Sequence, residues 1–464
     1  MKKTKRRSLV VYILSVGFFI GISLFVFRIV TNAESWVMKP INGHLSGDEL
    51  NQSGTIYDTN GVVLAESKNS KRVYNNDINV RKALMQTIGD GTPNISTSIQ
   101  NVCKSELFGY NFVLGLSAPP RFRTSKDITL TLNSELCKYA YQKMGDKKGA
   151  ISVYNYKTGE ILCLVSTPTY DPEDPPDISL DTTGKYDGVY LNRVLSGALT
   201  PGSTFKVITS SSAIENDPNI YNKTFTCHKT ESFGVDKITC VGYHGNIGIK
   251  RGFAESCNIT FANIAINLGA DKMTATANKM GFNKNLQIDG ITLGKSVYDV
   301  KNTSDVSLGW SGVGQYTDVV NPAHMMMIMG AVADGGRPTT PYLIKNMSSR
   351  LGIKSHIGTA KKGDEMLSKS TADDVNDLMR NAVTSNYGPS KFKNLEVCAK
   401  TGTAEVSDNK AKDPHSWMVG FSRDSDCPLA FVVVVENGGS GIKVAGSIAA
   451  DIMDKAQSIL RSSK

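Results

Sequence analysis

The 464-residue chain contains no internal repeat and no low-complexity tract, which excludes a repeat architecture. It also carries little excess charge beyond its N-terminus. The formal net charge is +9, and residues 1–30 hold six positive and no negative charges, so the remaining residues have a net charge of only +3. This balance gives no indication of nucleic-acid binding. Six histidines are present, but no Gly-x-Ser-x-Gly segment accompanies them, which argues against a Ser-His-Asp hydrolase.

A long apolar run lies near the N-terminus. Leu9 to Phe27 gives 19 uncharged, mostly apolar residues, enough to cross a bilayer core. Basic residues precede the run, so the positive-inside rule predicts a cytoplasmic N-terminus with the rest of the chain outside. The alternative is a cleaved signal peptide that ends near Ala33. We favour an uncleaved anchor, because secretory apolar cores usually span about 7–15 residues and Thr31 is not a favoured small residue at the −3 position.

The segment Ser203-Thr204-Phe205-Lys206 is a candidate nucleophile site. Positions i and i+3 share a face of a helix, so Lys206 would bring its amine against the Ser203 hydroxyl. If burial and neighbouring charge keep that amine neutral, it can remove the hydroxyl proton and let Ser203 attack a carbonyl. Pro201 and Gly202 indicate a tight entry that would place Ser203 at the positive end of the helix.

Two later motifs make this short match specific. Alone, Ser256 would more often cap a helix, Lys400 would be a solvated charge, and Gly402 would form a turn or bulge. They lie, however, in Ser256-Cys257-Asn258 and Lys400-Thr401-Gly402-Thr403. The order Ser-x-x-Lys, Ser-x-Asn, Lys-Thr-Gly resembles the triple signature of the penicillin-recognising serine acyltransferases.

The resemblance gives the second motif two roles. Ser256 would relay a proton between Lys206 and the leaving amine of the substrate. Asn258 would hydrogen-bond the substrate amide.

The third motif would bind the substrate's carboxylate and backbone. Lys400 would supply positive charge beside the nucleophile and the carboxylate, which Thr401 and Thr403 would grip. Gly402 would let an extended substrate backbone lie against an edge strand. In the family the oxyanion hole consists of two backbone N–H groups, which correspond here to those of Ser203 and Thr403.

The similarity extends over nearly the whole chain and is to the monofunctional, class B penicillin-binding proteins. Ser53 departs from it, because many members carry arginine there. The segments that carry the similarity are Gly149–Val153 with Thr158–Leu162, Pro168–Pro172, Asn192-Arg193, Gly312–Gln315 with Pro322, Asp334–Gly336, Trp417–Phe421, and Gly54–Asp58 with Gly61 and Leu64-Ala65.

This resemblance implies a D,D-transpeptidase that cross-links bacterial peptidoglycan. Ser203 would attack the penultimate D-alanine carbonyl of a stem peptide ending in D-Ala-D-Ala, and the acyl group would pass to an amine on a neighbouring stem. β-Lactams would acylate the same serine, and the chemistry would need no cofactor. The resemblance also implies a single-pass protein of the bacterial cell membrane, with its catalytic domain outside and a SEDS-type glycan polymerase as partner. Division, elongation and sporulation all remain open as cellular roles.

Two other functions were weighed. A β-lactamase would add a base that activates water, and the sequence shows no clear match to a deacylating glutamate between the second and third motifs. Its length, anchor and pedestal also argue against a β-lactamase. A β-lactam sensor or a scaffold for the polymerase complex is a non-catalytic alternative. Sensors usually carry several membrane helices and a cytoplasmic effector domain, whereas only about eight residues precede this anchor.

The expected organisation has four parts. The segment after the anchor is too short for a second large catalytic domain, so we expect a small pedestal module and a monofunctional enzyme. Ser117–Pro120 marks its predicted end. The parts are residues 1–8 as a cytoplasmic tail, 9–30 as a transmembrane anchor, 31–120 as the pedestal module and 121–464 as the transpeptidase domain.

The expected fold class of the large domain is α/β (α+β), with an antiparallel sheet flanked by helices from both ends and a helical subdomain beside it. The active site would lie where the helical part meets the sheet edge. The predicted elements are strands at 127–133, 150–154, 160–166, 395–400, 416–421 and 429–436, and helices at 134–144 and 447–460.

Eight cysteines are many for a chain that faces outward. Cys137 and Cys163 lie in apolar helix and strand patterns, and Cys398 and Cys427 lie near strands. We expect these four to be reduced and buried. Cys103 fits no pattern.

Four other soft ligands fall within 31 residues of one another: Cys227, Cys240, His244 and Cys257. Three thiolates and one imidazole would satisfy a closed tetrahedral zinc site of structural type. Their spacing is looser than that of a zinc finger, but some class B members bind structural zinc at comparable positions. A Cys227–Cys240 disulfide is the main alternative in an exported protein, and free thiols are the third.

Overall fold

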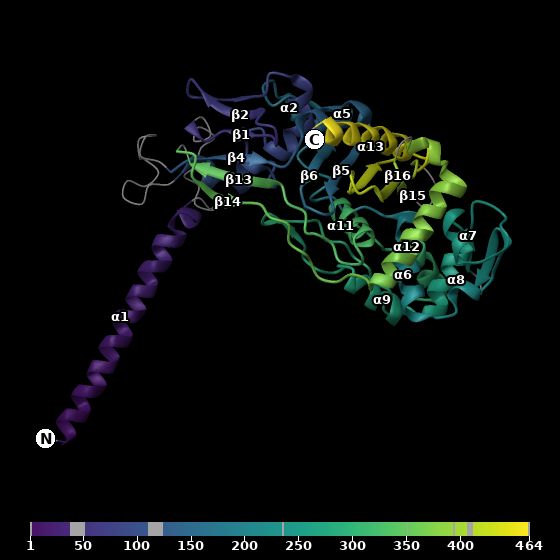
Figure 1. Ribbon diagram of the computed structural model, residues 1–464, viewed down its shortest axis with the longest axis horizontal. Coiled ribbons are helices and arrows are strands. Elements are labelled where there is room, and N and C mark those ends of the chain that lie inside the picture. Colours follow the sequence, from purple (N-terminus) through teal and green to yellow (C-terminus); the bar gives the residue numbers. More distant parts are fainter. Residues whose placement is uncertain are drawn as a thin grey trace.

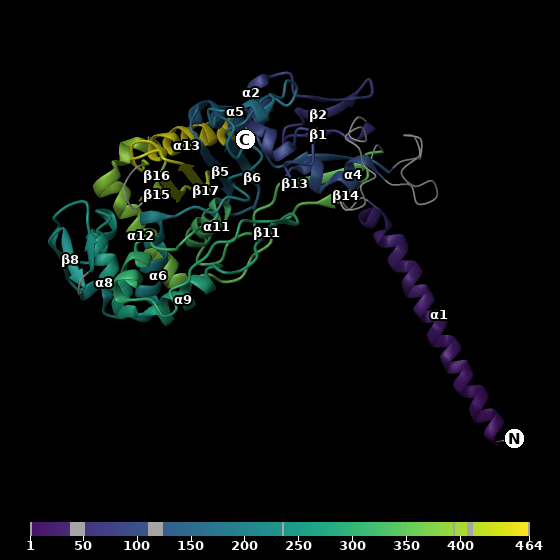
Figure 2. The ribbon, with the colours of Figure 1, turned by 180° about the vertical axis from the view of Figure 1, so that it is seen from behind.

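The computed structural model describes residues 2–37, 52–109, 124–233, 236–349, 351–392, 395–405 and 412–462. Its first element is the helix α1 (Lys2–Val37), which extends away from the other elements (Figures 1 and 2). The segment Thr4–Val30 of α1 is long and apolar enough to cross a membrane, and none of it is buried by the rest of the chain. The prediction of one long apolar helix near the N-terminus is therefore confirmed.

A five-stranded antiparallel sheet forms the centre of the large domain. Its strand order is β15-β16-β17-β5-β6, so the first and last segments of the domain meet in one sheet. The strands are β5 (Gly149–Asn155), β6 (Ile161–Thr167), β15 (Val397–Ala404), β16 (His415–Ser422) and β17 (Leu429–Val435). All five were predicted, and β15 is the edge strand.

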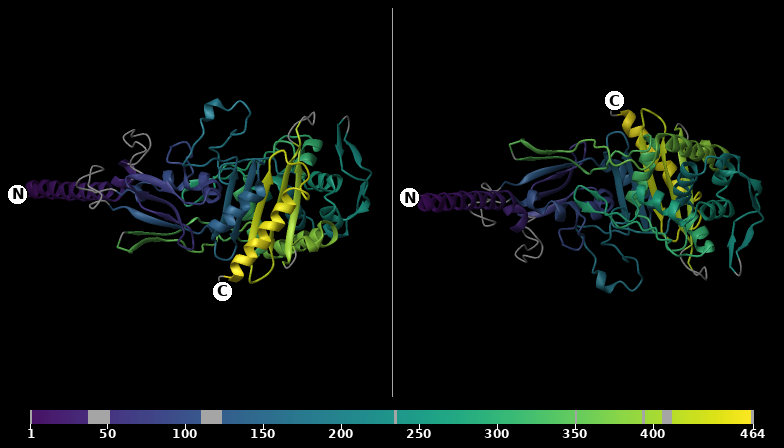
Figure 3. Two further views of the ribbon diagram at one scale, coloured as in Figure 1. Left: turned by 90° about the horizontal axis from the view of Figure 1, so that it is seen from above. Right: turned by 90° about the horizontal axis from the view of Figure 1, so that it is seen from below.

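Helices cover both faces of this sheet, which is why its inner strands are apolar throughout (Figures 1 and 3). On one face, α5 (Ser134–Met144) and α13 (Ala445–Ser462) pack against each other and against the sheet. On the other, α11 (Pro322–Ala333) packs against the inner strands and α12 (Lys369–Ala382) against the edge strand β15, and the side chains of α11 are buried nearly all round. The expected sheet flanked by helices from both ends is confirmed.

A helical subdomain lies beside the edge strand β15. Its helices pack around α6 and α8, and α12 joins them to the sheet. They are α6 (Lys206–Asn216), α7 (Ile249–Ala254), α8 (Asn258–Leu268), α9 (Ala270–Lys279) and α10 (Asp305–Gly312). Short strands and turns accompany them: β7 (Phe225–Cys227), β8 (Thr230–Phe233), β9 (Asp236–Thr239), β10 (Gly245–Ile247), β11 (Gln287–Ile288), β12 (Ile291–Thr292), and 3-10 turns at Ile178–Leu180, Ile220–Asn222 and Pro389–Phe392.

A second sheet lies between this domain and α1 (Figure 1). Its order is β14-β13-β4-β1-β2-β3. The strands are β1 (Ile56–Tyr57), β2 (Val63–Lys68), β3 (Lys71–Tyr74), β4 (Lys126–Leu130), β13 (Ile344–Ser349) and β14 (Lys354–Ile357). The accompanying helices are α2 (Ile78–Ile88), α3 (Ile99–Val102) and α4 (Lys104–Phe108).

This second sheet joins strands from both sides of residue 121, the expected start of the transpeptidase domain. The short strand β1 pairs in parallel with β4, and β4 pairs with β13, so segments after residue 121 complete the sheet. Pairing between strands so far apart leaves no local sequence pattern. The predicted boundary at 117–120 lies outside the described residues.

Candidate active site

The candidate nucleophile lies in a tight turn at the edge of the large sheet. Gly202–Phe205 forms a 3-10 turn, and the α-helix α6 begins only at Lys206. We expected Ser203 in the first turn of an α-helix, and the tighter 3-10 turn takes that place. Gly202 has φ +54, and a Cβ there would lie 3.0 Å from the carbonyl oxygen of Thr403. Glycine thus allows both the turn and its close approach to β15.

Lys206 is fully buried and surrounded by oxygens. Its Nζ lies 3.0 Å from Ser203 Oγ, 3.1 Å from Ser256 Oγ, 2.6 Å from Ser256 O and 2.8 Å from Asn258 Oδ1. Burial, and then the positive charge of Lys400, hold the pKa of Lys206 well below its usual range. The neutral amine has two hydrogens and one lone pair. Because the carbonyl of Ser256 and Oδ1 of Asn258 can only accept, they take the hydrogens and leave the lone pair for a hydroxyl.

The second motif lies at the start of α8. Ser256 adopts φ +57, a conformation that costs a non-glycine residue free energy and is typical of functional sites. Cys257 caps α8, with its Sγ accepting the N–H of Thr260. Asn258 is the first residue of α8 and donates one Nδ2 hydrogen to the carbonyl of Thr239 at 3.0 Å. Its second Nδ2 hydrogen is therefore available to a ligand in the cleft.

The third motif lies on β15. Lys400 is fully buried, and its Nζ donates to Ser256 Oγ at 3.0 Å, so Ser256 connects the two lysines. Burial lowers the pKa of Lys400 to about 7. Thr401 and Thr403 are two residues apart on the strand and both line the cleft beside Ser203.

Gly402 lies directly against the turn that carries Ser203. A Cβ there would lie 2.7 Å from the carbonyl oxygen of Pro201 and 3.0 Å from Cγ2 of Thr204. Its missing side chain thus makes room for the turn that carries Ser203.

The structure brings all eight candidate residues together around one cleft of about 990 Å³. Five line it: Ser203, Ser256, Asn258, Thr401 and Thr403. The two lysines contact two of these lining residues, Ser203 and Ser256, and Gly402 lies between Thr401 and Thr403 on β15. The sequence analysis missed Trp310, Tyr316 and Glu405, which also line the cleft, and Tyr387, which contacts the third motif.

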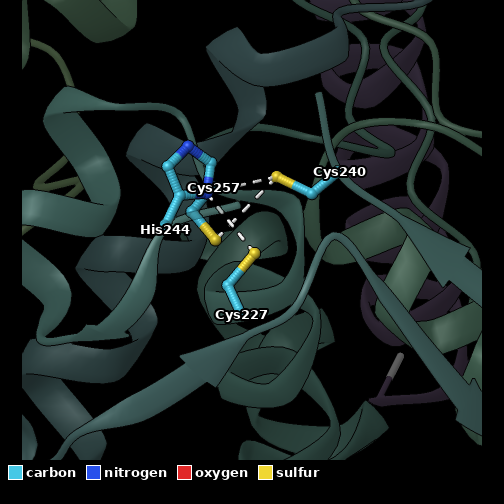
Figure 4. Close-up of side chains that lie close together, drawn as sticks. All are labelled: Cys227, Cys240, His244 and Cys257. Carbon is cyan, nitrogen blue, oxygen red and sulfur yellow. Dashed lines mark hydrogen bonds between the residues drawn. The ribbon is translucent and has the colours of Figure 1, made fainter. Parts of the chain in front are cut away.

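The four soft ligands form a second cluster (Figure 4), which adjoins the cleft because Cys240 also lines it. Their ligand atoms all lie within 4.8 Å of one another. Nδ1 of His244 lies 3.4 Å from Sγ of Cys227 and 3.5 Å from Sγ of Cys240, and the sulfurs of Cys240 and Cys257 are 4.0 Å apart. A tetrahedron with ordinary Zn–S and Zn–N bonds has S···N edges of about 3.5 Å and S···S edges of about 3.8 Å.

The cluster also has features of a metal site outside the four ligands. His244 turns its other nitrogen, Nε2, toward a carboxylate oxygen of Glu255 at 3.6 Å, the arrangement common for metal-bound imidazoles. All eight cysteines are buried and reduced, so the Cys227–Cys240 disulfide is not formed. The expectation that Cys137, Cys163, Cys398 and Cys427 are reduced and buried is confirmed.

Comparison with known proteins places this cleft in context. The family pattern described as "Penicillin binding protein transpeptidase domain" matches residues 149–454, which include all three motifs. The chain is 26% identical over 358 residues to the peptidoglycan D,D-transpeptidase PbpA of Mycolicibacterium smegmatis, covering 71% of each protein. Penicillin-binding protein A of M. tuberculosis, solved as a ceftriaxone acyl-enzyme complex, shares the fold with a TM-score of 0.77 at 22% identity, covering 89% of this chain and 100% of that one. The D,D-transpeptidase domain of a peptidoglycan glycosyltransferase from Eggerthella lenta has a TM-score of 0.77 at 25% identity, covering 88% of this chain and 98% of that one.

Proposed function

The chain belongs to the penicillin-binding protein transpeptidase family, and from this premise we propose that it is a serine D,D-transpeptidase of peptidoglycan. Its donor is a stem peptide ending in D-Ala-D-Ala, and β-lactams acylate the same serine. The observation that carries the proposal is the buried amine of Lys206, 3.0 Å from Ser203 Oγ, with both of its hydrogens engaged elsewhere. Such an amine is a base aimed at one hydroxyl.

The reaction follows from these contacts. Lys206 takes the proton of Ser203 as its oxygen attacks the penultimate D-alanine carbonyl, and the backbone N–H groups of Ser203 and Thr403 bind the oxyanion. The C–N bond to the terminal D-alanine breaks, and the proton reaches the leaving amine through Ser256. Asn258 holds the substrate amide. An acceptor amine then attacks the acyl ester and returns the proton through the same groups.

Two sets of contacts hold the donor's terminal carboxylate. Lys400 provides the charge, and the hydroxyls of Thr401 and Thr403 provide hydrogen bonds at the cleft wall. No cofactor is needed for this chemistry.

Acyl-enzyme lifetime and stem-peptide turnover test the proposal against its alternatives. A β-lactamase needs a base that activates water, and the described lining of the cleft contains one carboxylate, that of the exposed Glu405. We expect a penicillin adduct that lasts for hours, and D-alanine release from a stem peptide when an acceptor amine is present. Turnover of penicillin within seconds would identify a β-lactamase. A lasting adduct without any stem-peptide turnover would identify a sensor or a scaffold.

A structural zinc ion bound by Cys227, Cys240, His244 and Cys257 forms part of the proposal. The support is the donor set, the ligand spacing and the carboxylate behind His244. Cys257 stands between Ser256 and Asn258, so a ligand bond to its sulfur would also fix the neighbouring proton relay and amide contact.

Metal analysis and chelation test the zinc site. We expect about one zinc ion per chain, and we expect chelation to lower the melting temperature and the acylation rate together. Cys240→Ser should lose the metal, whereas Cys427→Ser, a change at a buried cysteine far along the chain, should keep it. A metal-free protein whose mass shows Cys227 joined to Cys240 would instead establish the disulfide.

The proposed topology places α1 in the bacterial membrane as a single-pass anchor, with residues 1–8 in the cytoplasm and the pedestal and transpeptidase domain outside. The apolar span of α1 and the basic residues before it support this orientation. A membrane glycan polymerase of the SEDS type is the proposed partner.

A reporter fused after Lys464 tests the orientation. We expect the reporter to be active outside the cytoplasm, and we expect the mature protein to retain residues 1–30. A mature N-terminus at Glu34 would show that the apolar segment is a cleaved signal peptide.

A further inference from the structure

The helix α12 ends in an unusual turn directly behind the cleft. Val383–Tyr387 is a π turn, closed where the N–H of Gly388 donates to the carbonyl of Val383 at 3.0 Å. Turns of this kind are rare and occur frequently at functional sites. Gly388 has φ +87, and the chain then leaves the helix axis toward β15. The turn therefore presents its last side chain, that of Tyr387, to the third motif.

The hydroxyl of Tyr387 contacts two residues of the third motif, Lys400 and Thr401. Its oxygen accepts from Lys400 Nζ at 3.2 Å and from the N–H of Thr401 at 3.2 Å, and it shares a hydrogen bond of 3.1 Å with the hydroxyl oxygen Oγ1 of Thr401. The side chain is 9% exposed, so bulk water competes little for these donors. One phenol oxygen thus determines where two adjacent residues of β15 place their donor groups.

The neighbouring residue ties the same turn to the second motif. Nδ2 of Asn386 donates to the carbonyl of Ala254 at 2.6 Å. Ala254 ends α7 and lies two residues before Ser256, which accepts from Lys400. The π turn is consequently bonded to the third motif through Tyr387 and to the segment just before the second motif through Asn386.

The groups around Lys400 are uncharged. Its described hydrogen-bond partners are three neutral oxygens: Oγ of Ser256, the carbonyl of Thr401 and the phenol of Tyr387. The rings of Phe253 and Tyr387 lie 5.6 Å and 5.9 Å from Nζ. Lys206, which contacts the same hydroxyl of Ser256, is also a cation when protonated. Since these partners orient the ammonium without neutralising it, its charge remains available to an incoming carboxylate.

We propose that Tyr387 is a positioning residue, which holds the ammonium of Lys400 and the side chain of Thr401 in place to receive the terminal carboxylate of the donor. The inference rests on the proposed transpeptidase function and extends it to a residue outside the three motifs. Tyr387 itself does not touch the substrate: it acts through Thr401, which lines the cleft, and through Lys400, whose charge lies behind it.

Removal of the phenol oxygen tests this role, because Tyr387→Phe keeps the ring and its packing. The measurement is the second-order rate of acylation by benzylpenicillin, which has a carboxylate, and by its methyl ester, which has none. We expect the variant to react roughly tenfold more slowly with benzylpenicillin, as is common for the loss of a hydrogen bond to a charged group. With the methyl ester, wild type and variant should react at the same rate.

The pH profile provides a second readout. The ammonium of Lys400 loses an acceptor in Tyr387→Phe, so its pKa, which burial already lowers to about 7, should fall further. On the alkaline side, the acylation rate with benzylpenicillin should therefore begin to fall at a lower pH in the variant than in wild type. A loss of folded protein would reduce the amount of acylated protein at every pH and would not change the pH at which the rate begins to fall.

Tyr156→Phe is the matched control. Tyr156 is also buried, and its hydroxyl donates to the carbonyl of Ser422 at 3.0 Å, away from the cleft. We expect this variant to react like wild type with both compounds. The inference is overturned if Tyr387→Phe slows both compounds equally or slows neither. If the wild-type protein is acylated by neither compound, the proposed function itself fails.

Discussion

Ser203→Ala is expected to abolish covalent labelling by a fluorescent penicillin. The hydroxyl oxygen of Ser203 is the group within the cleft that lies 3.0 Å from a buried neutral amine, and alanine removes that oxygen without adding bulk to the 3-10 turn. Ser256, the other hydroxyl beside this amine, is held between two lysines. We therefore expect loss of the adduct and not a slower reaction.

A matched serine on α6 controls for folding. Ser210 is buried, and its hydroxyl has no hydrogen-bond partner in the described part of the chain. Ser210→Ala should label at the wild-type rate, and both variants should unfold at temperatures close to that of the wild-type protein. Persistent labelling of Ser203→Ala would exclude Ser203 as the acylated residue.

The second large effect is expected from Lys206. Lys206→Ala should lower the acylation rate by about 10²–10⁴-fold, the range typical for loss of a positioned general base. The reason is geometric: two acceptor-only oxygens hold the amine hydrogens and direct the lone pair at a hydroxyl. The measurement is the second-order rate constant for acylation of the folded variant.

The pH dependence identifies the base. The wild-type rate should fall as the pH drops below the pKa of Lys206, because the protonated amine cannot accept the proton of Ser203. That pKa lies well below the usual range of a lysine, so the fall should begin at a lower pH than it would with an ordinary lysine. Lys206→Met, which fills the same space beside the ring of Phe261, should not show this fall in rate at low pH. A variant that retains both its rate and its acid limb would show that another group is the base.

Local patterns predicted the elements of the large domain well. Helix α5 begins and ends at the expected residues, because Asn133 caps its start through the N–H of Leu136 and Gly145 follows its end. The strand β15 was expected to stop at Lys400, but it continues to Ala404, since its pairing with β16 holds the chain extended through the whole third motif. A boundary set by a partner strand cannot be found in the strand's own sequence.

The three motifs predicted which residues lie together at the cleft. The residues that contact and position them, such as Tyr387, could not be predicted from the sequence. The order of the three motifs was informative because each residue type has a chemical purpose. Tyr387 lies 13 residues before Lys400, in a π turn that no periodicity indicates. The second sheet was missed in part for a similar reason, because β13 and β14 come from residues 344–357 and join the sheet only through the pairing of β13 with the distant strand β4.

The central claim is that Ser203 carries the acyl group of a stem peptide before an amine receives it. The most direct measurement is mass spectrometry of the wild-type protein, quenched during reaction with a peptide ending in D-Ala-D-Ala. The account predicts an adduct with the mass of the peptide minus its terminal D-alanine, located by fragmentation on Ser203 within the tryptic peptide 194–206. It also predicts that an added acceptor amine removes the adduct and forms the cross-linked product. An adduct on any other residue, or cross-linked product without a covalent intermediate, would contradict it.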